Sequence, residues 1–397
     1  MADSGYALRE QRNYTWKCLK SIGWGFGGCN MGCDHCYNAS TFISQMQSFP
    51  ELRAIADLIC PFIDSINFGT GEFDFNANAV QLARYINNFY PHVKLAITTN
   101  GTSILLLRPE EVKKIFHDVD VSLDFPNPEE HNRFRKHPMA WEFVQTSLMI
   151  LKNLGMERSI VTCVTSRHTD DHIRQMLSFA QEYGASWRTN WFRLTGRGKE
   201  HLRITADRFW GVIKLLAQEG WLFECLSDPL LASLLGRPDK NPVHGCACAK
   251  LSCRIQTDST VTPCVYLKGQ EWSGGSILQD GKLIEGNRFS IPINTLEKIY
   301  ESDRFRAVRE RFPDRCKECK YGETCRGGCS SRAFLHSGGL DQLDDFCPFI
   351  TMEREKAEDM LSEIRSLAQI IDGTGKVHDG YLCTMIVNQP PIVKLGC

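Results

Sequence analysis

The sequence lacks the features that would place it at a membrane or on nucleic acid. No stretch of this 397-residue chain reaches the roughly 18 apolar residues that a transmembrane helix needs. Its N-terminus has no apolar core of the kind that a secretory signal carries. Lys and Arg (46) nearly balance Asp and Glu (47), so a formal net charge of -1 offers nothing to attract polyanions. We therefore expect a cytoplasmic protein with no membrane and no nucleic-acid partner.

Cysteine, in contrast, is abundant. Eighteen cysteines in a chain without a secretory signal favour metal ligation over disulfides. Three of them, Cys29, Cys33 and Cys36, lie within eight residues, so one loop can bring three thiolates to a point. Three thiolates bind three irons of a [4Fe–4S] cube and leave the fourth iron open for chemistry. A zinc site or chance clustering is the alternative, but zinc prefers four protein ligands and only His35 is close enough to be the fourth.

Residues 19–220 alternate between apolar, β-rich runs and amphipathic helical runs. The runs predict a short strand before the cysteine loop and further strands at 65–68, 94–99, 119–123, 159–165 and 187–194. Helical patterns cover 51–60, 78–90, 109–117, 141–154, 170–183 and 206–219. This alternation predicts an α/β fold with parallel strands and right-handed crossovers, and six units make an incomplete (β/α)6 barrel. Sites in such sheets form at the carboxyl ends of the strands, where the cysteine loop lies.

The motif Cys29-x3-Cys33-x2-Cys36, followed by Tyr37, resembles the signature of radical S-adenosylmethionine (SAM) enzymes. The resemblance implies that the open iron binds the amino and carboxylate groups of SAM. One electron then cleaves SAM to methionine and a 5′-deoxyadenosyl radical, which abstracts hydrogen from the substrate. A reductant such as flavodoxin or ferredoxin would supply the electron.

Two strand ends resemble further motifs of this family. Thr70-Gly71-Glu72 takes the place of a Gly-Gly-Glu-Pro motif, whose backbone would meet the SAM amino group because glycine permits close approach. Thr70 replaces a glycine of that motif, and an ordinary β-to-α turn is the alternative interpretation. Asn100 ends the third strand, where the family often has the same Thr-Asn-Gly triplet.

Two later strand ends complete the predicted cofactor site. Ser122 and Arg135 match a Ser-x-Asp…His-x-x-x-Arg pattern, and by resemblance they hold the SAM ribose and carboxylate. A solvated surface charge is the alternative for Arg135. By the same resemblance, a backbone group of Leu194 contacts adenine.

A second cysteine array follows residue 245. Its spacing resembles the SPASM extension, which holds two auxiliary [4Fe–4S] clusters; a pair of zinc sites is the alternative. The resemblance implies that one cluster takes Cys246 or Cys248 together with Cys253, Cys264 and Cys329. The other cluster takes Cys316, Cys319, Cys325 and Cys347. Cys383 and Cys397 are either hydrogen donors or simple tail residues.

We predict five segments from these signals. They are an N-terminal segment (1–18), a radical SAM partial barrel (19–220), a helix-rich linker (221–245), an auxiliary-cluster domain (246–349), and a C-terminal helix with an irregular tail (350–397).

SPASM enzymes mostly modify peptides, so the resemblance favours modification of a ribosomally synthesised precursor peptide by crosslinking, thioether formation, epimerisation or backbone excision. Eighteen N-terminal residues cannot form a recognition domain, which implies either a separate recognition-domain protein as partner or a different docking surface on the enzyme. Val265 takes the place of an aspartate that acts as a general base in sulfatase-maturating members of the family. Valine cannot accept a proton, which argues against the mechanism of those enzymes. The alternatives are a dehydrogenase or epimerase acting on a small molecule such as an aminocyclitol, and a non-enzymatic iron–sulfur or zinc protein.

Overall fold

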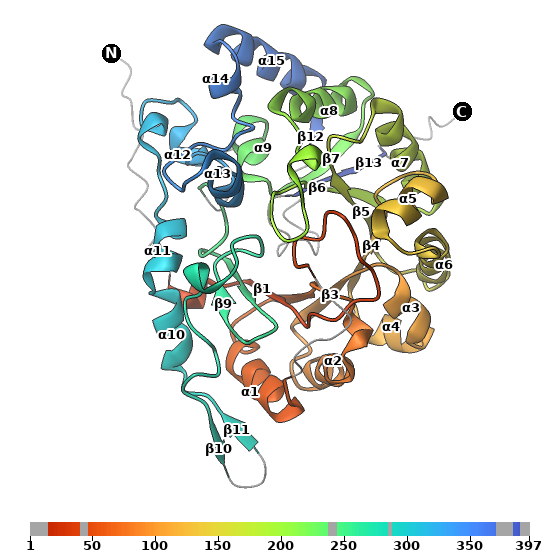
Figure 1. Ribbon diagram of the computed structural model, residues 1–397, viewed down its shortest axis with the longest axis vertical. Coiled ribbons are helices and arrows are strands. Elements are labelled where there is room, and N and C mark those ends of the chain that lie inside the picture. Colours follow the sequence, from red (N-terminus) through yellow and green to blue (C-terminus); the bar gives the residue numbers. More distant parts are fainter. Residues whose placement is uncertain (1–14, 40–46, 237–243, 285–287, 371–383, 390–397) are drawn as a thin grey trace, which may run out of the picture.

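The computed structural model describes residues 15–39, 47–236, 244–284, 288–370 and 384–389 (Figure 1). Its centre is a curved sheet in which six parallel strands follow one another in chain order. They are β1 (Ser21–Trp24), β2 (Ser65–Phe68), β3 (Lys94–Thr99), β4 (Asp118–Ser122), β5 (Arg158–Val164) and β6 (Ser186–Trp191). The predicted α/β partial barrel is therefore confirmed.

The helices that connect these strands lie on the outside of the curved sheet (Figure 1). They are α1 (Phe49–Ile59), α2 (Ala77–Phe89), α3 (Thr102–Leu106), α4 (Pro109–Ile115), α5 (Pro128–Arg135), α6 (Ala140–Asn153), α7 (Asp170–Glu182) and α8 (Ala206–Gln218). Local sequence explains where they begin. The side chain of Asn76 caps α2, Thr169 forms a capping box with His172 at α7, and Thr205 caps α8.

The sheet extends beyond the predicted barrel on the β6 side, which corrects two predictions. Residues 221–245 were expected to form a helix-rich linker, but β7 (Leu222–Leu226) joins the sheet before the short helix α9 (Pro229–Leu234). The tail was expected to be irregular, but β13 (Thr384–Asn388) lies between β6 and β7 and pairs antiparallel with both. Its apolar residues are buried on both faces, a pattern that is hard to distinguish from a loop in five residues. At the edge, β12 (Gln369–Ile370) pairs with β7.

The other side of the sheet is extended by the cysteine-rich region. Strand β8 (Ser252–Ile255) pairs in parallel with β1, and β9 (Val261–Thr262) follows it antiparallel. Cys253 lies opposite Ile22 in this register. The second cysteine array is thus joined to the first strand of the barrel through main-chain hydrogen bonds.

The remaining elements, which are short except for α15, lie beside the β1 edge or over the β7 side (Figure 1). They are the hairpin β10 (Lys282–Ile284) and β11 (Arg288–Ser290), and the helices α10 (Asn294–Tyr300), α11 (Asp303–Arg309), α12 (Gly322–Cys325), α13 (Ser330–Ser337), α14 (Pro348–Thr351) and α15 (Arg354–Leu367). Five 3₁₀ turns are described: η1 (Trp16–Cys18), η2 (Phe73–Phe75), η3 (Glu200–Leu202), η4 (Gln270–Trp272) and η5 (Asp314–Cys316). None of the helices in the described ranges is both long and apolar enough to cross a bilayer.

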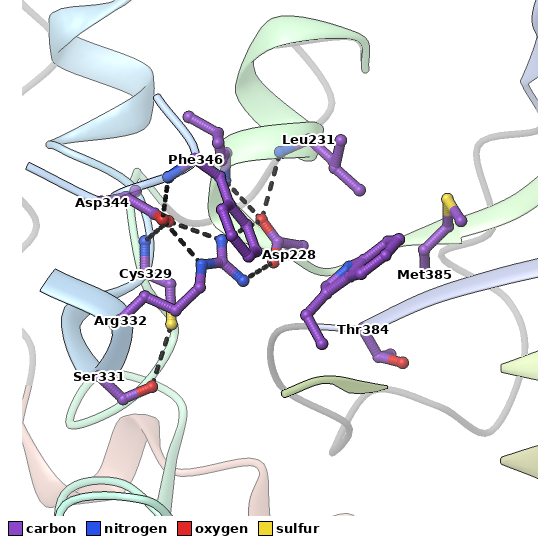
Figure 2. Close-up of polar contacts among 12 residues, drawn as sticks. Asp228, Leu231, Cys329, Ser331, Arg332, Asp344, Phe346, Thr384 and Met385 are labelled. Carbon is purple, nitrogen blue, oxygen red and sulfur yellow. Dashed lines mark hydrogen bonds and ion pairs between the residues drawn. The ribbon is translucent and has the colours of Figure 1, made fainter. Parts of the chain in front are cut away.

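A buried ion network fastens the cysteine-rich region to the β7 side (Figure 2). The guanidinium of Arg332 donates to Asp228 (2.6 Å) and to Asp344 (2.6 and 2.8 Å), and all three side chains are fully buried. Asp228 also caps α9, while Asp344 accepts a hydrogen bond from the backbone N–H of Cys329 at 2.8 Å. The network therefore fixes the position of a predicted cluster ligand relative to the sheet.

Candidate functional site

A cavity of about 220 Å³ opens at the carboxyl ends of the parallel strands. Ten of the predicted radical-site and cofactor residues line it: Cys29, Cys33, Cys36, Tyr37, Thr70, Gly71, Glu72, Asn100, Ser122 and Arg135. They come from the cysteine loop and from the ends of β2, β3 and β4, with Arg135 at the end of α5. The fold thus brings together residues that lie more than 100 positions apart in the sequence.

The three cysteines of the first motif share one buried corner of this cavity. Burial, the Glu72 charge and the two neighbouring thiols raise the pKa of Cys29 to about 12. The loop is held in place because Arg197 donates its backbone N–H to the carbonyl of Cys36 (2.9 Å) and its Nε to that of Cys33 (3.0 Å). Three neighbouring cysteines that line a cavity, with Cys33 buried and Cys29 and Cys36 partly buried, fit the ligand set of an iron–sulfur cube with one open iron.

His35 does not complete a four-ligand zinc set. Its Nε2 lies 3.8 Å from the carboxylate of Asp124, and its ring stacks on Phe134 at a centroid distance of 4.6 Å. Burial lowers the pKa of His35 to about 4, so the imidazole is neutral at pH 7. The imidazole packs against Phe134 and Asp124, and we do not count it as a metal ligand beside the three thiols.

The Thr70-Gly71-Glu72 segment is connected directly to the cysteine loop. Gly27 donates its N–H to the carbonyl of Thr70 (3.1 Å), and Glu72 donates its N–H to the carbonyl of Gly28 (2.6 Å). A Cβ at Gly71 would lie 2.4 Å from that carbonyl oxygen, so only glycine permits this approach. Thr70 itself has φ of +95°, a conformation that favours glycine, and its hydroxyl contacts the Tyr37 hydroxyl at 2.9 Å. Strain of this kind is typical of functional sites.

Glu72 organises the ends of β2 and β3. Its buried carboxylate accepts hydrogen bonds from the backbone N–H of Asn100 (2.8 Å), from both the N–H (3.0 Å) and the hydroxyl (2.6 Å) of Ser103, and from Thr99. Burial raises the pKa of this carboxyl. Asn100 in turn places its side-chain amide 3.8 Å from the sulfur of Cys29. The carboxylate therefore positions the loop that faces the cysteines.

Arg135 is neither exposed nor isolated, contrary to the alternative of a solvated surface charge. Its Nε donates to the fully buried carboxylate of Asp124 at 2.6 Å, and its Nη1 lies 4.0 Å from the sulfur of Cys33. Burial alone would raise the pKa of Asp124, but the charges of Arg135 and the neighbouring histidines hold it well below its usual range. Ser122 lies at the end of β4 beside this pair and also lines the cavity.

Leu194 is the one predicted cofactor residue that does not line the cavity. Its backbone N–H donates to Nε2 of His336 at 3.1 Å, and its side chain packs against the aromatic cluster of Phe125, Phe134 and Phe192. Its contact with adenine stays a prediction.

The four cysteines predicted for the second auxiliary cluster come together. Burial raises the pKa of Cys325, and the neighbouring Cys347 and Cys316 raise it further. Burial followed by the neighbouring Cys319 raises the pKa of Cys316, and burial together with Cys316 and Cys319 raises that of Cys347. These effects place the four thiols near one another, and their binding of a single cluster stays a prediction.

The first auxiliary array is brought together in part. Contacts with Cys246 and Cys264, followed by burial, raise the pKa of Cys248, so its sulfur lies beside each of those two. Cys253 lies on β8 and lines the cavity. Cys329 lies at the start of α13, with its sulfur 3.1 Å from the hydroxyl of Ser331. Both Cys246 and Cys248 are buried beside Cys264, and the choice between them as ligand stays open. Cys383 and Cys397 lie outside the described residues.

Three buried arginines that line the cavity were not predicted as site residues. Arg188 lies on β6, Arg193 follows β6 and Arg254 lies on β8. β8 was not predicted as a strand of the barrel sheet, so nothing placed Arg254 at the site. The only sequence signal was the pair of Gly23 in β1 and Gly25 directly after it, whose missing side chains leave room for the arginine.

Comparisons with known proteins agree with this geometry. The model of the radical SAM superfamily matches residues 25–180. The mycofactocin maturase MftC of Mycolicibacterium smegmatis is 25% identical over 83% of this chain and 83% of its own length. The AdoMet-dependent heme synthase of Methanosarcina barkeri is 24% identical over 81% of this chain and 93% of its own length. The cysteine-type anaerobic sulfatase-maturating enzyme of Clostridium perfringens is 23% identical over 81% of this chain and 90% of its own length.

Solved structures show the same fold. Native anSMEcpe with bound AdoMet and the Cp18Cys peptide superposes with a TM-score of 0.63 at 18% identity, covering 88% of this chain and 99% of that one. Streptococcus suis SuiB bound to the precursor peptide SuiA gives a TM-score of 0.62 at 15% identity, and the match covers 83% of this chain and 75% of SuiB.

Proposed function

This chain is a radical SAM enzyme, and we propose that it modifies a ribosomally synthesised peptide by hydrogen abstraction. The observation that carries the proposal is the triad of Cys29, Cys33 and Cys36. It faces a cavity lined by the strand-end residues that the family motif predicts. A [4Fe–4S] cluster bound there supplies the electron that cleaves SAM to methionine and the 5′-deoxyadenosyl radical.

The residues around the triad would bind and orient SAM. Arg135 and Ser122 are positioned for its carboxylate and ribose, and the backbone at Thr70 and Gly71 for its amino group. Their burial keeps water away from the reacting atoms, which suits a reactive radical.

We also propose two auxiliary [4Fe–4S] clusters. The mutual proximity of Cys316, Cys319, Cys325 and Cys347 supports the second, and the proximity of Cys248 to Cys264 supports the first. Cys329 would serve the first cluster although its sequence neighbour Cys325 serves the second. Such crossing joins remote segments, so the region should need iron to fold.

The relatives support a peptide as the substrate. Those named above include a mycofactocin maturase and a sulfatase-maturating enzyme, and one solved neighbour binds a precursor peptide. Val265 lines the cavity and cannot accept a proton, so we do not assign this chain the aspartate-dependent step of sulfatase maturation. A recognition-domain protein, a flavodoxin or ferredoxin reductant and a cytoplasmic setting belong to the same proposal.

A small-molecule substrate is the second candidate, and one observation favours it. AdoMet-dependent heme synthases match 81% of this chain or more at 23–24% identity. None of the relatives named above points to an aminocyclitol.

Anaerobic reconstitution tests the central proposal. Wild type should bind about twelve irons and form 5′-deoxyadenosine with dithionite and SAM. The Cys29/Cys33/Cys36→Ala variant should keep about eight irons and form none. Cys18→Ala is the matched control and should behave as wild type, because this cysteine lies outside both arrays. Zinc in place of iron, or no deoxyadenosine from fully loaded wild type, would contradict the proposal.

Isotope transfer tests the substrate class. Short peptides encoded beside the gene would be made with perdeuterated residues and incubated with loaded enzyme and SAM. Deuterium in 5′-deoxyadenosine together with a mass change in the peptide supports peptide modification. Unlabelled deoxyadenosine and unchanged peptides, with turnover of a porphyrin instead, would support the second candidate.

A further inference from the structure

Arg254 is a buried cation inside the cavity. It lies on β8, next to β1, and is only 4% exposed. Its Nη2 donates to the carbonyl of Gly69 and to the hydroxyl of Thr70. The guanidinium therefore reaches from the cysteine-rich region across β1 to the end of β2.

Two glycines, Gly23 in β1 and Gly25 directly after it, make this path possible. A Cβ at Gly23 would lie 2.6 Å from Nη1 of Arg254, and a Cβ at Gly25 would lie 2.8 Å from Nη2. Both residues lie on the same face of the strand, because side chains alternate between faces. The sequence Gly23-Trp24-Gly25 thus leaves a channel for one arginine side chain.

The charge of Arg254 is not matched within the described residues. The cavity arginines Arg135 and Arg188 form ion pairs with Asp124 and Asp120. Arg254 has no such pair in that part of the chain, and its buried Nε has no hydrogen-bond partner there. A buried charge is costly unless it is paired, so this guanidinium is suited to an anion that enters the cavity.

We propose that Arg254 binds a carboxylate of the substrate, either the C-terminal carboxylate or an acidic side chain of the peptide. The inference rests on the proposed function for the nature of the substrate. Guanidinium N–H groups bind carboxylates well, and because Nη2 already donates twice, Nη1 and Nε are the donors of Arg254 left for one. The substrate is thereby anchored at the β1–β8 side of the cavity, beside the cysteine triad.

Ligand-observed ¹⁹F NMR tests this subsite with trifluoroacetate as the carboxylate probe and trifluoroacetamide as its neutral match. Iron-loaded, SAM-saturated wild type should bind trifluoroacetate and not the amide. Arg254→Gln should bind it at least about tenfold more weakly, the loss expected for a charge-assisted pair. Arg188→Gln is the matched control and should keep the binding, because its charge is already paired with Asp120.

Equal trifluoroacetate binding by wild type and Arg254→Gln would overturn the proposal, as would an equal loss in Arg188→Gln. Iron content and melting temperature identify any variant that fails to fold. Gly25→Ala then supplies a second test, because it displaces the guanidinium without removing it and should also weaken binding.

Repeating the trifluoroacetate titration without SAM shows whether SAM and trifluoroacetate compete for Arg254. Binding that persists when SAM is added assigns the subsite to the substrate. Displacement of trifluoroacetate by SAM would assign Arg254 to the SAM carboxylate and overturn the substrate assignment. The titration does not depend on turnover, so absence of deoxyadenosine would contradict the proposed function and leave this result standing.

Discussion

The Nη2 atom of Arg193 lies 3.4 Å from the sulfur of Cys329. The guanidinium carbon of Arg193 lies over the ring of Tyr266, 4.3 Å from the ring centroid. The backbone N–H of Tyr266 lies 3.5 Å from the sulfur of Cys264. Arg193 and Tyr266 both line the cavity. They therefore form the wall between the substrate space and two predicted ligands of the first auxiliary cluster.

Replacing Arg193 should change that cluster without removing it. Hydrogen bonds and positive charge near a ligand sulfur stabilise the reduced, more negative state. We expect Arg193→Gln to lower the reduction potential of the first auxiliary cluster and Arg193→Lys to lower it less. Redox titration followed by EPR, in the Cys29/Cys33/Cys36→Ala background, isolates the auxiliary signals.

Arg188→Gln is the control for this measurement, since Arg188 lines the same cavity but pairs with Asp120. An unchanged potential in Arg193→Gln at full iron content would show that Arg193 does not act on the cluster.

The buried network of Asp228, Arg332 and Asp344 should dominate the attachment of the cysteine-rich region (Figure 2). Arg332→Met leaves two buried carboxyls without their cation, and breaking such a pair costs about 3–5 kcal/mol. The urea midpoint of anaerobic unfolding should fall accordingly. Arg306→Met makes the same change in an exposed pair with Asp303 and should cost less than about 1 kcal/mol. Similar midpoints for the two variants would contradict a structural role for the network.

Truncation tests the importance of the inserted strand β13. A chain ending at residue 383 lacks the strand that bridges β6 and β7, so both lose a hydrogen-bonded neighbour. We expect it to aggregate or to melt well below wild type. A chain ending at Gln389 keeps β13 and is the matched control. If the shorter chain were as soluble and stable as the control, the strand would contribute nothing to the barrel.

The difference between β13 and β2 shows what the sequence could reveal. β2, with the glycine motif after it, lies in a repeated β/α pattern, and its predicted bounds of 65–68 were correct. β13 and β8 pair with strands far away in the sequence, and no local periodicity records such a partner. The same holds at the site. Cysteine spacing predicted the four ligands of a second auxiliary cluster, and these thiols are neighbours although the cluster itself stays a prediction, whereas Arg254 reaches the cavity only through the pairing of β8 with β1.

The neutral state of His131 makes stability depend on pH. Its Nδ1 accepts a hydrogen bond from the backbone N–H of Asp124 at 3.2 Å, and burial followed by the Arg135 charge lowers its pKa to about 3. Between pH 6.5 and 3 the unfolded chain therefore binds a proton that the folded chain does not. Stability from this residue is complete above pH 6.5 and falls as the solution is acidified, by about 2 kcal/mol from pH 7 to pH 5.

His131→Gln cannot bind that proton and should flatten the pH dependence over this range, although it is less stable than wild type at pH 7. Urea unfolding between pH 5 and pH 8 measures how the free energy of unfolding changes with pH in wild type and in the variant. His35 and His168 also have lowered pKa values through burial, so part of the slope should remain in the variant. A variant whose slope equals that of wild type would mean that His131 is protonated in the folded protein, and that the Asp124 N–H donates elsewhere.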